Sequence, residues 1–377
     1  MVEDKKLAIV VHGFFSDSFG GVPVFIRNLA EEFAGRGYGA FVVTKSRTRR
    51  YVVSQPANGM KVYEIPVHIA GWFPSLSFLS FIGFWFSLFV YSPRIFRVEK
   101  PLCIHGHGVV YGGVQSVVLG KVLNVPTVVT VHGLDRRLSR TMAVFLKRAD
   151  LIVVQTNAMR EKLIRSGFRE KSIVEIPNGI RRQTHADTRI SKRIRVLFVG
   201  RFDTFREPLL FVNSAYEALM GGFEGEFVMI GDGPLYPETM RRIRELGIQD
   251  RVILTGRLDN LSEHYANADV YVACSPIENY SSLSLLEAMS FGLAIIATDV
   301  GETRRIAEDK VNAILCRAES RSISSALLRL QNQPNLIVVL GKKNLKLIAD
   351  EFDIQLMTDR YENAFKGVMD GRNRRRI

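Results

Sequence analysis

The chain has 377 residues, which is more than one ordinary domain holds and suggests two or three domains. Apolar residues make up 47% of it, and its three widely spaced cysteines form no CxxC pair, which argues against a disulfide framework or a cysteine-based zinc site. The net charge of +13 favours an anionic partner such as nucleic acid, a membrane or a phosphate-bearing substrate, and is equally compatible with an ordinary solvated surface.

The predicted elements begin with MVEDKKLAIVVHGF, whose short apolar run is typical of a first β-strand and not of a signal peptide. Together with the cysteine usage, this predicts a reducing, cytoplasmic compartment. Helical patterns follow between most of the apolar runs, as in GVPVFIRNLAEEFAGRG at 21–37, which has an i, i+3, i+4 apolar face. The predicted strands of the first half are 6–11, 40–44, 61–66, 102–108, 126–133, 151–156 and 172–179.

Residues 67–92 contain no Asp, Glu, Lys or Arg, and the part from 75 to 92 reaches the lower length limit of a membrane-spanning helix. A span here would divide the first domain across a bilayer, because strands are predicted before and after it. We therefore favour a helix in the membrane interface, with aromatic side chains in lipid and Arg94, Arg97 and Lys100 at the head groups. A buried helix or a dimer contact is the alternative.

The second half repeats the strand–helix pattern after RRQTHADTRISKR at 181–193, a polar stretch that we interpret as a linker. Because the strands are apolar throughout and alternate with helices, they predict an α/β protein with parallel sheets covered on both faces. We expect two doubly wound, Rossmann-like domains, at 1–183 and 184–352, that face each other across a central cleft and bind ligands at the carboxyl ends of their strands. The strands of this half are 195–200, 226–233, 251–256, 269–275 and 293–301.

Glycines and arginines follow two of the predicted strands. Gly20 and Gly21 either let a ligand approach the amino terminus of the first helix or form a plain tight turn. Their pattern is not G-x-G-x-x-G, so the dinucleotide fingerprint is absent. Arg201 and Arg206 follow the first strand of the second half, where two guanidinium groups either clamp a diphosphate or begin an ordinary surface helix.

The stretch SPIENYSSLSLLEAMSFG at 275–292 has one glutamate before a predicted helix and another inside it. A helix that begins near Leu283 directs its free backbone N–H groups to a place where diphosphate oxygens bind well. Glu287, one turn into the helix, suits the two hydroxyls of a ribose, and Glu278 suits a sugar ring. The alternative is a solvated Glu278 and a helix-stabilising Glu287, although apolar neighbours make that reading poor for Glu287.

Several motifs occur together and in a characteristic order. They are FGGV, TVHG, IPNGI, FVGRFDTFRE, MIGDGP, DVYVACSPIEN, LLEAMSFG and IIATDVGE. On these motifs the chain resembles the retaining glycosyltransferases of family 4 over nearly its whole length. The resemblance implies a hexosyltransferase of the GT-B fold, with an acceptor-binding first domain, a nucleotide-sugar-binding second domain, and a helix at 353–377 that packs back on the first domain and ends in a basic tail.

The resemblance also implies roles for individual residues. Arg201 and Arg206 look like the pair that neutralises the donor diphosphate, and Glu287 looks like the ribose-binding glutamate. Glu278 looks like the glutamate near the transferred sugar, and His132 in TVHG looks like the histidine beside the reacting carbon, although a histidine at a strand end is also often a satisfied polar group. The other implied donor-binding residues are Gly20, Gly21, Gly231, Ser282, Leu283 and Ser284.

The implied mechanism is attack on the same face of the sugar, in which the leaving diphosphate helps to deprotonate the acceptor hydroxyl. No metal and no cofactor is expected. The chain departs from the family pattern at several positions: eight residues separate Glu278 from Glu287 where the family has seven, Asn279 and Glu302 stand where glycines are common, and Arg206 stands where lysine is expected.

Within family 4, GMKVYEIPVHIA resembles the subgroup that contains the catalytic subunits of phosphatidylinositol N-acetylglucosaminyltransferase. This implies a lipid or lipid-linked glycan acceptor, with an inositol phospholipid as one candidate. The family resemblance implies a UDP- or GDP-sugar donor, and the segment 67–92 with the basic groups after it predicts peripheral binding at the cytoplasmic face of an anionic membrane. Nucleic acid is not expected as a partner, and a partner subunit or a homodimer stays open. Two other functions remain: a nucleotide-sugar epimerase of the same fold, and a catalytically silent donor-binding subunit at a membrane.

Overall fold

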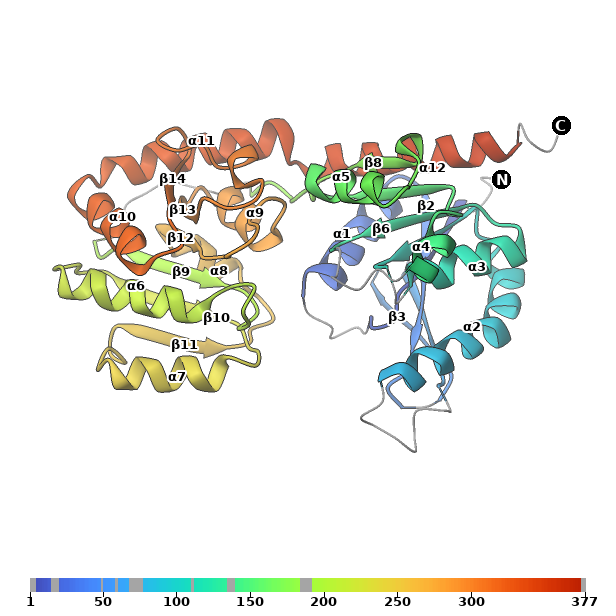
Figure 1. Ribbon diagram of the computed structural model, residues 1–377, viewed down its shortest axis with the longest axis horizontal. Helices are drawn as coiled ribbons and strands as arrows, with labels where there is room; N and C mark the ends of the chain where they lie inside the picture. The colour runs from blue at the N-terminus through green and yellow to red at the C-terminus, as the bar shows by residue number, and fades with distance from the viewer. Residues whose placement is uncertain are drawn as a thin grey trace. The chain divides into compact units, whose positions relative to one another are not determined.

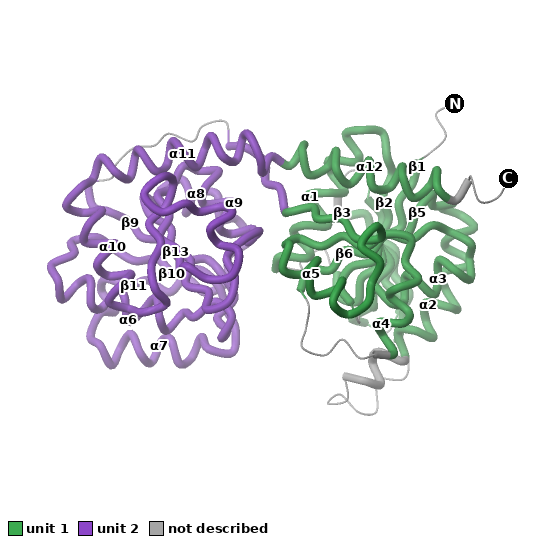
Figure 2. The backbone as a smooth tube through the Cα atoms, turned by 45° about the horizontal axis from the view of Figure 1, so that its top comes forward, with its two compact units in different colours: residues 1–177, 354–377 green, residues 178–353 purple. Residues whose placement is uncertain are grey.

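The computed structural model describes residues 5–14, 20–48, 50–57, 60–67, 77–109, 112–133, 140–183 and 192–373 (Figure 1). The chain divides into two compact units (Figure 2). Unit 1 consists of Met1–Pro177 and Ile354–Ile377, and unit 2 consists of Asn178–Asp353. Each unit is built on its own sheet of mainly parallel strands, so the predicted α/β class with two sheets is confirmed.

The sheet of unit 1 has the strand order β3-β4-β2-β1-β5-β6-β7-β8. Its neighbouring strands pair in parallel, except that β3 runs antiparallel to β4 at one edge. The strands are β1 Lys5–Val10, β2 Tyr38–Lys45, β3 Val52–Ala57, β4 Met60–Ile65, β5 Cys103–His107, β6 Thr127–Val131, β7 Leu151–Val154 and β8 Ile173–Glu175.

Helices cover both faces of this sheet. Alternate strand residues point to opposite faces, so Val129 and Val131 pack with α3, α4 and α5, whereas Thr130 meets Tyr361 of α12 on the other face. The helices are α1 Gly21–Gly35, α2 Ser77–Glu99, α3 Gly113–Leu123, α4 Arg140–Leu146, α5 Asn157–Arg165, the 3-10 helix η2 Glu170–Ser172, and α12 Ile354–Asn373.

The carboxyl end of α2 is fixed to the sheet through Glu99, whose side chain is only 2% exposed. Lys6 and Lys61 donate to its two carboxylate oxygens at 3.1 and 2.9 Å, and the Tyr63 hydroxyl donates as well. Burial opposes ionisation, but these hydrogen bonds outweigh it and lower the pKa of Glu99 to about 2.

Only part of the apolar segment 67–92 belongs to the described residues, because 68–76 lie outside them and α2 begins at Ser77. Pro93 lies inside α2, and Arg97 lies in its last turn. Among the helices that the structure describes, none combines the length and the apolar character needed to cross a bilayer.

The sheet of unit 2 is entirely parallel and has the order β11-β10-β9-β12-β13-β14. This is the order of a doubly wound dinucleotide-binding sheet, in which the first strand lies in the middle and the direction of winding reverses beside it. The strands are β9 Arg195–Val199, β10 Glu226–Ile230, β11 Val252–Gly256, β12 Val270–Ala273, β13 Ala294–Thr298 and β14 Ala313–Cys316.

Two apolar clusters hold the helices of unit 2 against the two faces of its sheet. One contains residues of α6, α7 and α10, and the other contains residues of α8, α9 and the carboxyl-terminal half of α11. The helices are α6 Pro208–Met220, α7 Tyr236–Glu245, α8 Ser262–Ala266, α9 Leu283–Ser290, the 3-10 helix η3 Thr303–Arg305, α10 Ser320–Asn332 and α11 Asn335–Glu351.

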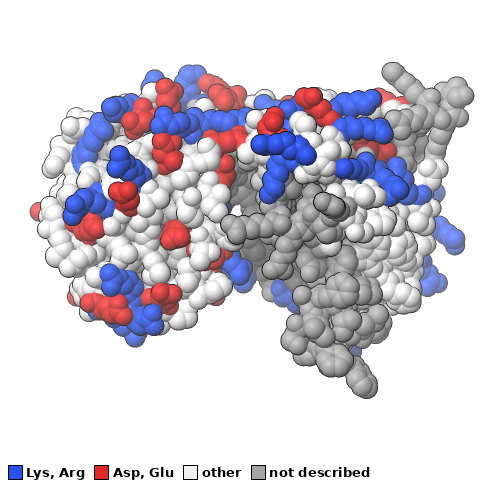
Figure 3. All heavy atoms as spheres, viewed as in Figure 1, with Lys and Arg blue, Asp and Glu red and all other residues white. Residues whose placement is uncertain are grey.

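Charged side chains of both signs are mixed on the face of unit 2 that Figure 3 shows. In unit 2, the Arg241 side chain of α7 lies 3.9 Å from a carboxylate oxygen of Glu238 and 3.5 Å from one of Glu245. Exposed pairs of this kind contribute only ~0.2–1 kcal/mol each. On this face, therefore, the basic residues form an ordinary solvated surface and no single-sign patch.

The closing helix that we predicted at 353–377 is α12, which begins at Ile354 and is separated from α11 by an interruption at Phe352 and Asp353. The interruption has a physical cause, because the Phe352 carbonyl accepts a hydrogen bond from the Ile180 N–H at 2.8 Å and the Asp353 carboxylate pairs with Arg182. These contacts belong to unit 2, and the chain passes into unit 1 directly after them.

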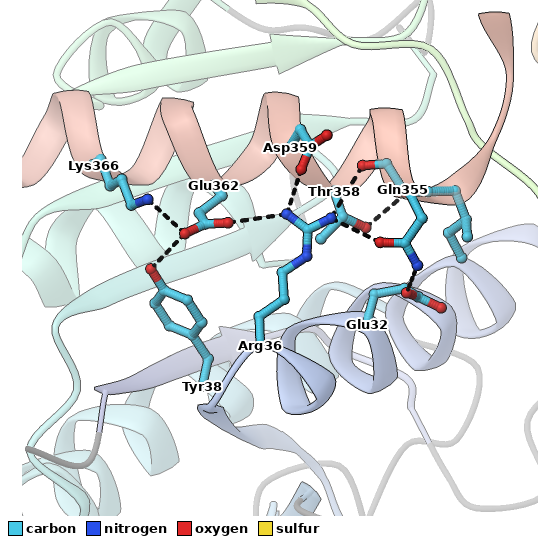
Figure 4. Close-up of polar contacts among 9 residues, drawn as sticks. Glu32, Arg36, Tyr38, Gln355, Thr358, Asp359, Glu362 and Lys366 are labelled. Atoms are coloured by element: carbon cyan, nitrogen blue, oxygen red, sulfur yellow. Dashed lines mark hydrogen bonds and ion pairs between the residues drawn. The ribbon is translucent and has the colours of Figure 1, made fainter. Parts of the chain in front are cut away.

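Within unit 1, α12 packs on α1 through a row of polar contacts (Figure 4). The Arg36 guanidinium donates to Asp359 at 2.5 Å, to Glu362 at 3.0 Å and to the Gln355 side chain at 2.9 Å. The Tyr38 hydroxyl donates to Glu362 at 3.1 Å. These contacts fasten the last helix of the chain to the first.

Candidate functional site

The winding of unit 2 reverses between β9 and β12, and ligands of doubly wound sheets bind at this point, outside the carboxyl ends of the strands. Gly200 and Arg201 follow β9, and the loop to α9 follows β12. Eight of the predicted site residues belong to unit 2, and they surround this edge: Arg201, Arg206, Gly231, Glu278, Ser282, Leu283, Ser284 and Glu287.

Gly231 lets the ends of β9 and β10 approach closely. Its φ is +142°, and a Cβ there would lie 1.9 Å from the Gly200 carbonyl oxygen. Only glycine fits this combination of backbone conformation and space. Gly231 therefore supports the position of the turn that carries Arg201.

Arg201 and Arg206 differ in their surroundings. The Arg201 side chain is 70% exposed, and its Nε lies 3.3 Å from an Asp203 carboxylate oxygen. Arg206 is half-buried beside Gly200, where its Cγ would lie 3.5 Å from a Cβ built at Gly200. Burial raises the pKa of Tyr271 to about 12, and the hydrogen bond with Ser284 and the nearby Arg206 charge act in the opposite direction.

Tyr271 connects these strand ends to α9. Its hydroxyl lies 2.9 Å from Ser284 Oγ and 3.2 Å from the Val199 carbonyl oxygen. It therefore brings the first turn of α9 to the end of β9, the strand that Arg206 follows. Ser282 occupies the N-cap of α9 without a side-chain capping bond, and its Oγ lies 3.2 Å from Ser284 Oγ.

The first turn of α9 is suited to an anion. The N–H groups of the first residues of a helix have no acceptor within the helix, and the helix dipole makes this end positive. In α9 these include the N–H groups of Leu283 and Ser284, while the Ser282 N–H donates to the Asn279 carbonyl at 3.2 Å. Two N–H groups and an arginine at one edge can together neutralise a diphosphate.

Glu287 is half-buried one turn into α9, and the Tyr265 hydroxyl lies 2.9 Å from its Oε2. Burial raises the pKa of Glu287, and the hydrogen bond from Tyr265 partly opposes this effect. Its carboxylate can accept further hydrogen bonds, as a ribose diol would donate.

Glu278 holds its own loop. The Tyr280 N–H donates to Oε1 at 2.8 Å, and the Glu302 N–H donates to Oε2 at 2.9 Å. Burial raises the pKa of Glu278 while these hydrogen bonds oppose it. A Cβ built at Gly301, whose φ is +54°, would lie 2.5 Å from Oε2, so Gly301 must stay glycine for this contact to form. Glu278 thus connects the β12–α9 loop to the turn after β13.

Asn279 stands at a position where the family commonly has glycine, and it has a definite structural role. It is buried, and its Nδ2 donates to the Thr298 carbonyl and Oγ1, both at 3.0 Å. These bonds tie the same loop to the end of β13. The departure from the family pattern thus adds an anchor to the loop.

Gly20, Gly21 and His132 belong to unit 1. Gly20 is the N-cap of α1 and has a φ of +113°, which favours glycine. Residues 15–19 of the same loop lie outside the described residues. Phe25, in the second turn of α1, packs edge-on against His132 with ring centroids 5.1 Å apart, so the beginning of α1 and His132 lie at the same edge of this sheet.

Both ring nitrogens of His132 have protein partners. Its Nδ1 lies 3.1 Å from Gln155 Nε2, and its Nε2 lies 2.9 Å from His107 Nδ1. Because the Gln155 amide donates to Nδ1, the hydrogen of His132 is on Nε2 and is donated to His107. Burial lowers the pKa of His132 to about 4, so the ring is neutral at pH 7.

His105 and His107 form a buried aromatic group beneath His132. Their ring centroids are 4.1 Å apart, and those of His107 and His132 are 5.2 Å apart. His105 Nε2 lies 2.7 Å from Thr130 Oγ1, which in turn lies 3.1 Å from the Tyr361 hydroxyl. Burial lowers the pKa of both histidines. Among the residues that the structure describes, no three His, Cys, Asp or Glu side chains are grouped to hold a metal ion.

Sequence reasoning missed the residues that hold the site in place. Tyr265 and Tyr271 position Glu287 and Ser284, and Gln155 and His107 orient His132. For Tyr271 the signal available was a polar hydroxyl inside the apolar stretch DVYVAC, and for His107 and Gln155 it was a polar side chain at the end of a predicted strand. Such a signal does not identify the partner.

Comparisons with known proteins agree with this architecture. The family model described as Glycosyltransferase Family 4 matches residues 19–184, and the one described as Glycosyl transferases group 1 matches residues 193–333. The phosphatidylinositol N-acetylglucosaminyltransferase GPI3 subunit of Saccharomyces cerevisiae is 25% identical over 344 residues, covering 86% of this chain and 74% of that protein.

Two solved structures share the fold. Sucrose-phosphate synthase from Thermosynechococcus elongatus has a TM-score of 0.77 at 19% identity, over 97% of this chain and 100% of that one. HepE of Anabaena, solved in complex with UDP, has a TM-score of 0.74 at 16% identity, over 96% of this chain and 100% of that one. The two sheets and the switch-point edge therefore define a protein of the GT-B fold. The matches to both halves go further, and the chain belongs to the family 4 glycosyltransferases.

Proposed function

We propose that the protein transfers a sugar from a UDP- or GDP-linked donor to a hydroxyl of a membrane lipid or lipid-linked glycan, with retention at the anomeric carbon. The part of this proposal that concerns the nucleotide-sugar donor is supported by the carboxyl edge of the sheet in unit 2. There Arg206, the first turn of α9 and Glu287 lie around one switch point, with Arg201 on the same turn.

The donor would be held by charge and by hydroxyl recognition. Arg201, Arg206 and the N–H groups of Leu283 and Ser284 are donors for the diphosphate, and they stabilise the negative charge that grows on it during bond cleavage. Glu287 accepts hydrogen bonds from the ribose hydroxyls. The fold shared with HepE, which was solved with UDP, supports a nucleotide ligand.

Retention would follow from attack on the face that the diphosphate leaves. His132 is neutral and donates its only N–H to His107, so it is poorly placed to exchange a proton with the acceptor. The departing diphosphate is then the base that takes the proton of the acceptor hydroxyl. Because arginines and helix N–H groups supply the positive charge, the proposed reaction requires no metal.

The part of the proposal that concerns the acceptor is supported by the outer surface of α2, α3 and α4, which pack side by side in unit 1. Their sequences contain a single acidic residue, Glu99, and it is buried. Arg94, Arg97 and Lys121 are exposed on them. Among the side chains of these helices that the structure describes, the large exposed apolar ones are Phe86 (67%), Val90 (54%), Val98 (70%), Val122 (64%), Val144 (51%) and Phe145 (37%).

Exposed apolar and basic groups on helices that carry no exposed acidic residue of their own are the combination that binds an anionic lipid surface. Lys121 contributes less than Arg94 and Arg97, because its Nζ lies 3.8 Å from an Asp150 carboxylate oxygen. The similarity to a phosphatidylinositol N-acetylglucosaminyltransferase subunit also supports a lipid acceptor, with phosphatidylinositol as the first candidate. We therefore place the proposed reaction at a membrane surface to which the protein binds peripherally, at its cytoplasmic face.

A transfer assay tests the proposal. Purified protein is incubated with radiolabelled UDP- and GDP-sugars and a phospholipid extract, and the label in the organic phase is counted. We expect label in lipid, a loss of it in Arg206→Ala, and normal transfer in Arg241→Ala, an exposed arginine on the surface of α7. Label that stays in the aqueous phase, or that appears as a changed nucleotide sugar without acceptor, would contradict the proposal. The anomeric configuration of the product, read by NMR, tests retention.

Sedimentation with vesicles tests the membrane surface. Wild type should sediment with phosphatidylcholine vesicles that contain phosphatidylserine, and less with pure phosphatidylcholine. Phe86→Ser and Arg94→Ala should reduce this binding. Val339→Ser should not, since Val339 is an exposed apolar residue (50%) on α11 of unit 2. Equal binding by all the variants would remove this support for a lipid acceptor.

A further inference from the structure

We propose that Asn178 is a positioning residue for the donor-binding loop 278–284, and that it acts by holding Ser281 in a left-handed backbone conformation. The inference rests on the proposed donor site, because it assigns a role to a residue that supports that site from outside it. Asn178 lies in the motif IPNGI and is the first residue of unit 2.

Two hydrogen bonds join Asn178 to Ser281. The Asn178 N–H donates to Ser281 Oγ at 2.8 Å, and its Nδ2 donates to the Ser281 carbonyl at 2.7 Å. Both residues are buried, with exposed fractions of 6% and 5%. Both the main chain and the side chain of Asn178 thus bind the same residue, which fixes its orientation as well as its position.

Ser281 needs this support because its φ is +62°. Residues other than glycine avoid this region, since the Cβ comes too close to the backbone. Such a conformation persists only where the surroundings impose it, and imposed strain of this kind is concentrated at functional sites. The Asn178 hydrogen bonds are contacts that impose it here.

The left-handed residue lies where the chain must accommodate its additional residue. Eight residues separate Glu278 from Glu287, one more than is usual in the family. Before Ser281, Asn279 is tied to the end of β13 and Glu278 to the turn after it. After Ser281, α9 begins at Leu283. A reversal at Ser281 therefore absorbs the extra residue while both flanking segments keep their anchors.

The consequence is a defined position for the donor contacts. If Ser281 relaxed to an ordinary conformation, the chain direction would change two residues before Leu283. The N–H groups of the first turn of α9 would then no longer point toward the diphosphate. Loss of the Asn178 bonds should therefore weaken nucleotide binding although Asn178 touches no nucleotide.

A matched pair of isosteric variants tests this role. Asn178→Asp removes a buried Nδ2 donor from the Ser281 carbonyl. Asn344→Asp, on α11, removes a buried Nδ2 donor from the Leu293 carbonyl at the opposite, amino end of the sheet. Each variant loses one buried hydrogen bond from an amide Nδ2 to a backbone carbonyl. A difference between the two variants therefore depends on where the bond lies and not on a general loss of stability.

The first readout is hydrogen exchange without ligand. In Asn178→Asp, amides of the peptide 278–285 should exchange about fivefold or more faster than in wild type, while Asn344→Asp should leave them within about twofold, because exchange reports local opening. Equal exchange at 278–285 in the two variants would overturn the proposal.

The second readout is titration with UDP and with GDP. The nucleotide that wild type binds should bind about tenfold more weakly to Asn178→Asp and within about twofold of wild type to Asn344→Asp. An effect of about tenfold corresponds to the loss of one charge-assisted hydrogen bond between an N–H group of α9 and the diphosphate. In steady-state kinetics, the KM for the donor should increase in Asn178→Asp, while kcat should change less. Faster exchange with unchanged nucleotide affinity would also overturn the positioning role. If wild type binds neither nucleotide, the proposed function fails, and the exchange result still decides whether Asn178 holds the loop.

Discussion

Replacement of Gly231 by alanine should disrupt the donor edge of unit 2 from within the backbone. The new Cβ would lie 1.9 Å from the Gly200 carbonyl oxygen, whereas real Cβ contacts are not closer than 3.0 Å, so the ends of β9 and β10 must separate by about 1.1 Å (3.0 − 1.9). That movement displaces the residue that follows Gly200, which is Arg201.

The cost has two parts. The positive φ of +142° costs an alanine ~1–2 kcal/mol, and forcing an extra methyl group into a packed site costs ~1–3 kcal/mol. The sum is ~2–5 kcal/mol, which lowers the Tm of a unit of this size by roughly 4–20 °C. Nucleotide affinity should fall by about tenfold or more, because displacements near 1 Å are enough to impair a site.

Gly222→Ala is the control. Gly222 also has a positive φ, +90°, but nothing lies within 4 Å of its Cβ position, so alanine there bears only the conformational cost. Calorimetry of Gly222→Ala should show a free energy of unfolding that is lower by ~1–2 kcal/mol and a Tm that is lower by roughly 2–8 °C. UDP or GDP should bind to this variant as to wild type. The reasoning is refuted if the two variants lose the same stability, or if Gly231→Ala binds nucleotide as wild type does.

Four further predictions follow from charged and titratable groups. Glu287→Gln should weaken nucleotide binding about tenfold in titrations at pH 7, because an amide replaces a charged acceptor. Since burial raises the pKa of Glu287, wild-type affinity should also decline on acidification from a higher pH than an exposed glutamate would give, and the variant should lack this decline. Glu99→Gln should lower the free energy of unfolding by ~3 kcal/mol at pH 7, measured by denaturant titration. Because the folded-state pKa of Glu99, about 2, lies below the ordinary value of 4.5, this advantage of wild type is complete above that value and lost as the pH falls towards 2, so an equal cost at pH 3 and pH 7 would contradict it. Arg36→Ala should destabilise the packing of α12 by ~1 kcal/mol, seen as faster hydrogen exchange confined to α12, and unchanged exchange there would count against the contacts in Figure 4. His132→Asn should lower the rate without changing the shape of its pH profile between about pH 6 and 8, since His132 is neutral there; a wild-type inflection that the variant lacks would disprove this.

The sequence was sufficient for the class of fold and for most of its strands. Apolar β-branched runs between helical patterns are local signals, and they predicted two parallel sheets. It did not predict β3 and β14. Both are edge strands that pair with a single neighbouring strand. β3 contains Pro56, which weakens its local strand signal, and β14 is a four-residue strand.

Motif spacing was likewise sufficient to select the residues of the donor edge, because Arg201, Arg206 and Glu287 stand at fixed distances from strands and helix starts. It did not reveal that Glu278 is tied to the backbone after β13, or that both ring nitrogens of His132 have partners. Those facts depend on side chains from other strands.

By itself, then, the amino-acid order determined what is local: the periodicity of each element, the strand ends, and the candidate polar groups that follow them. The tertiary structure alone decided which of these groups meet. Asn178 and Ser281 are 103 positions apart, and Tyr265 and Glu287 are 22 apart on different helices. No local pattern encodes such contacts, because they exist only once the sheet has brought its strand ends to one edge.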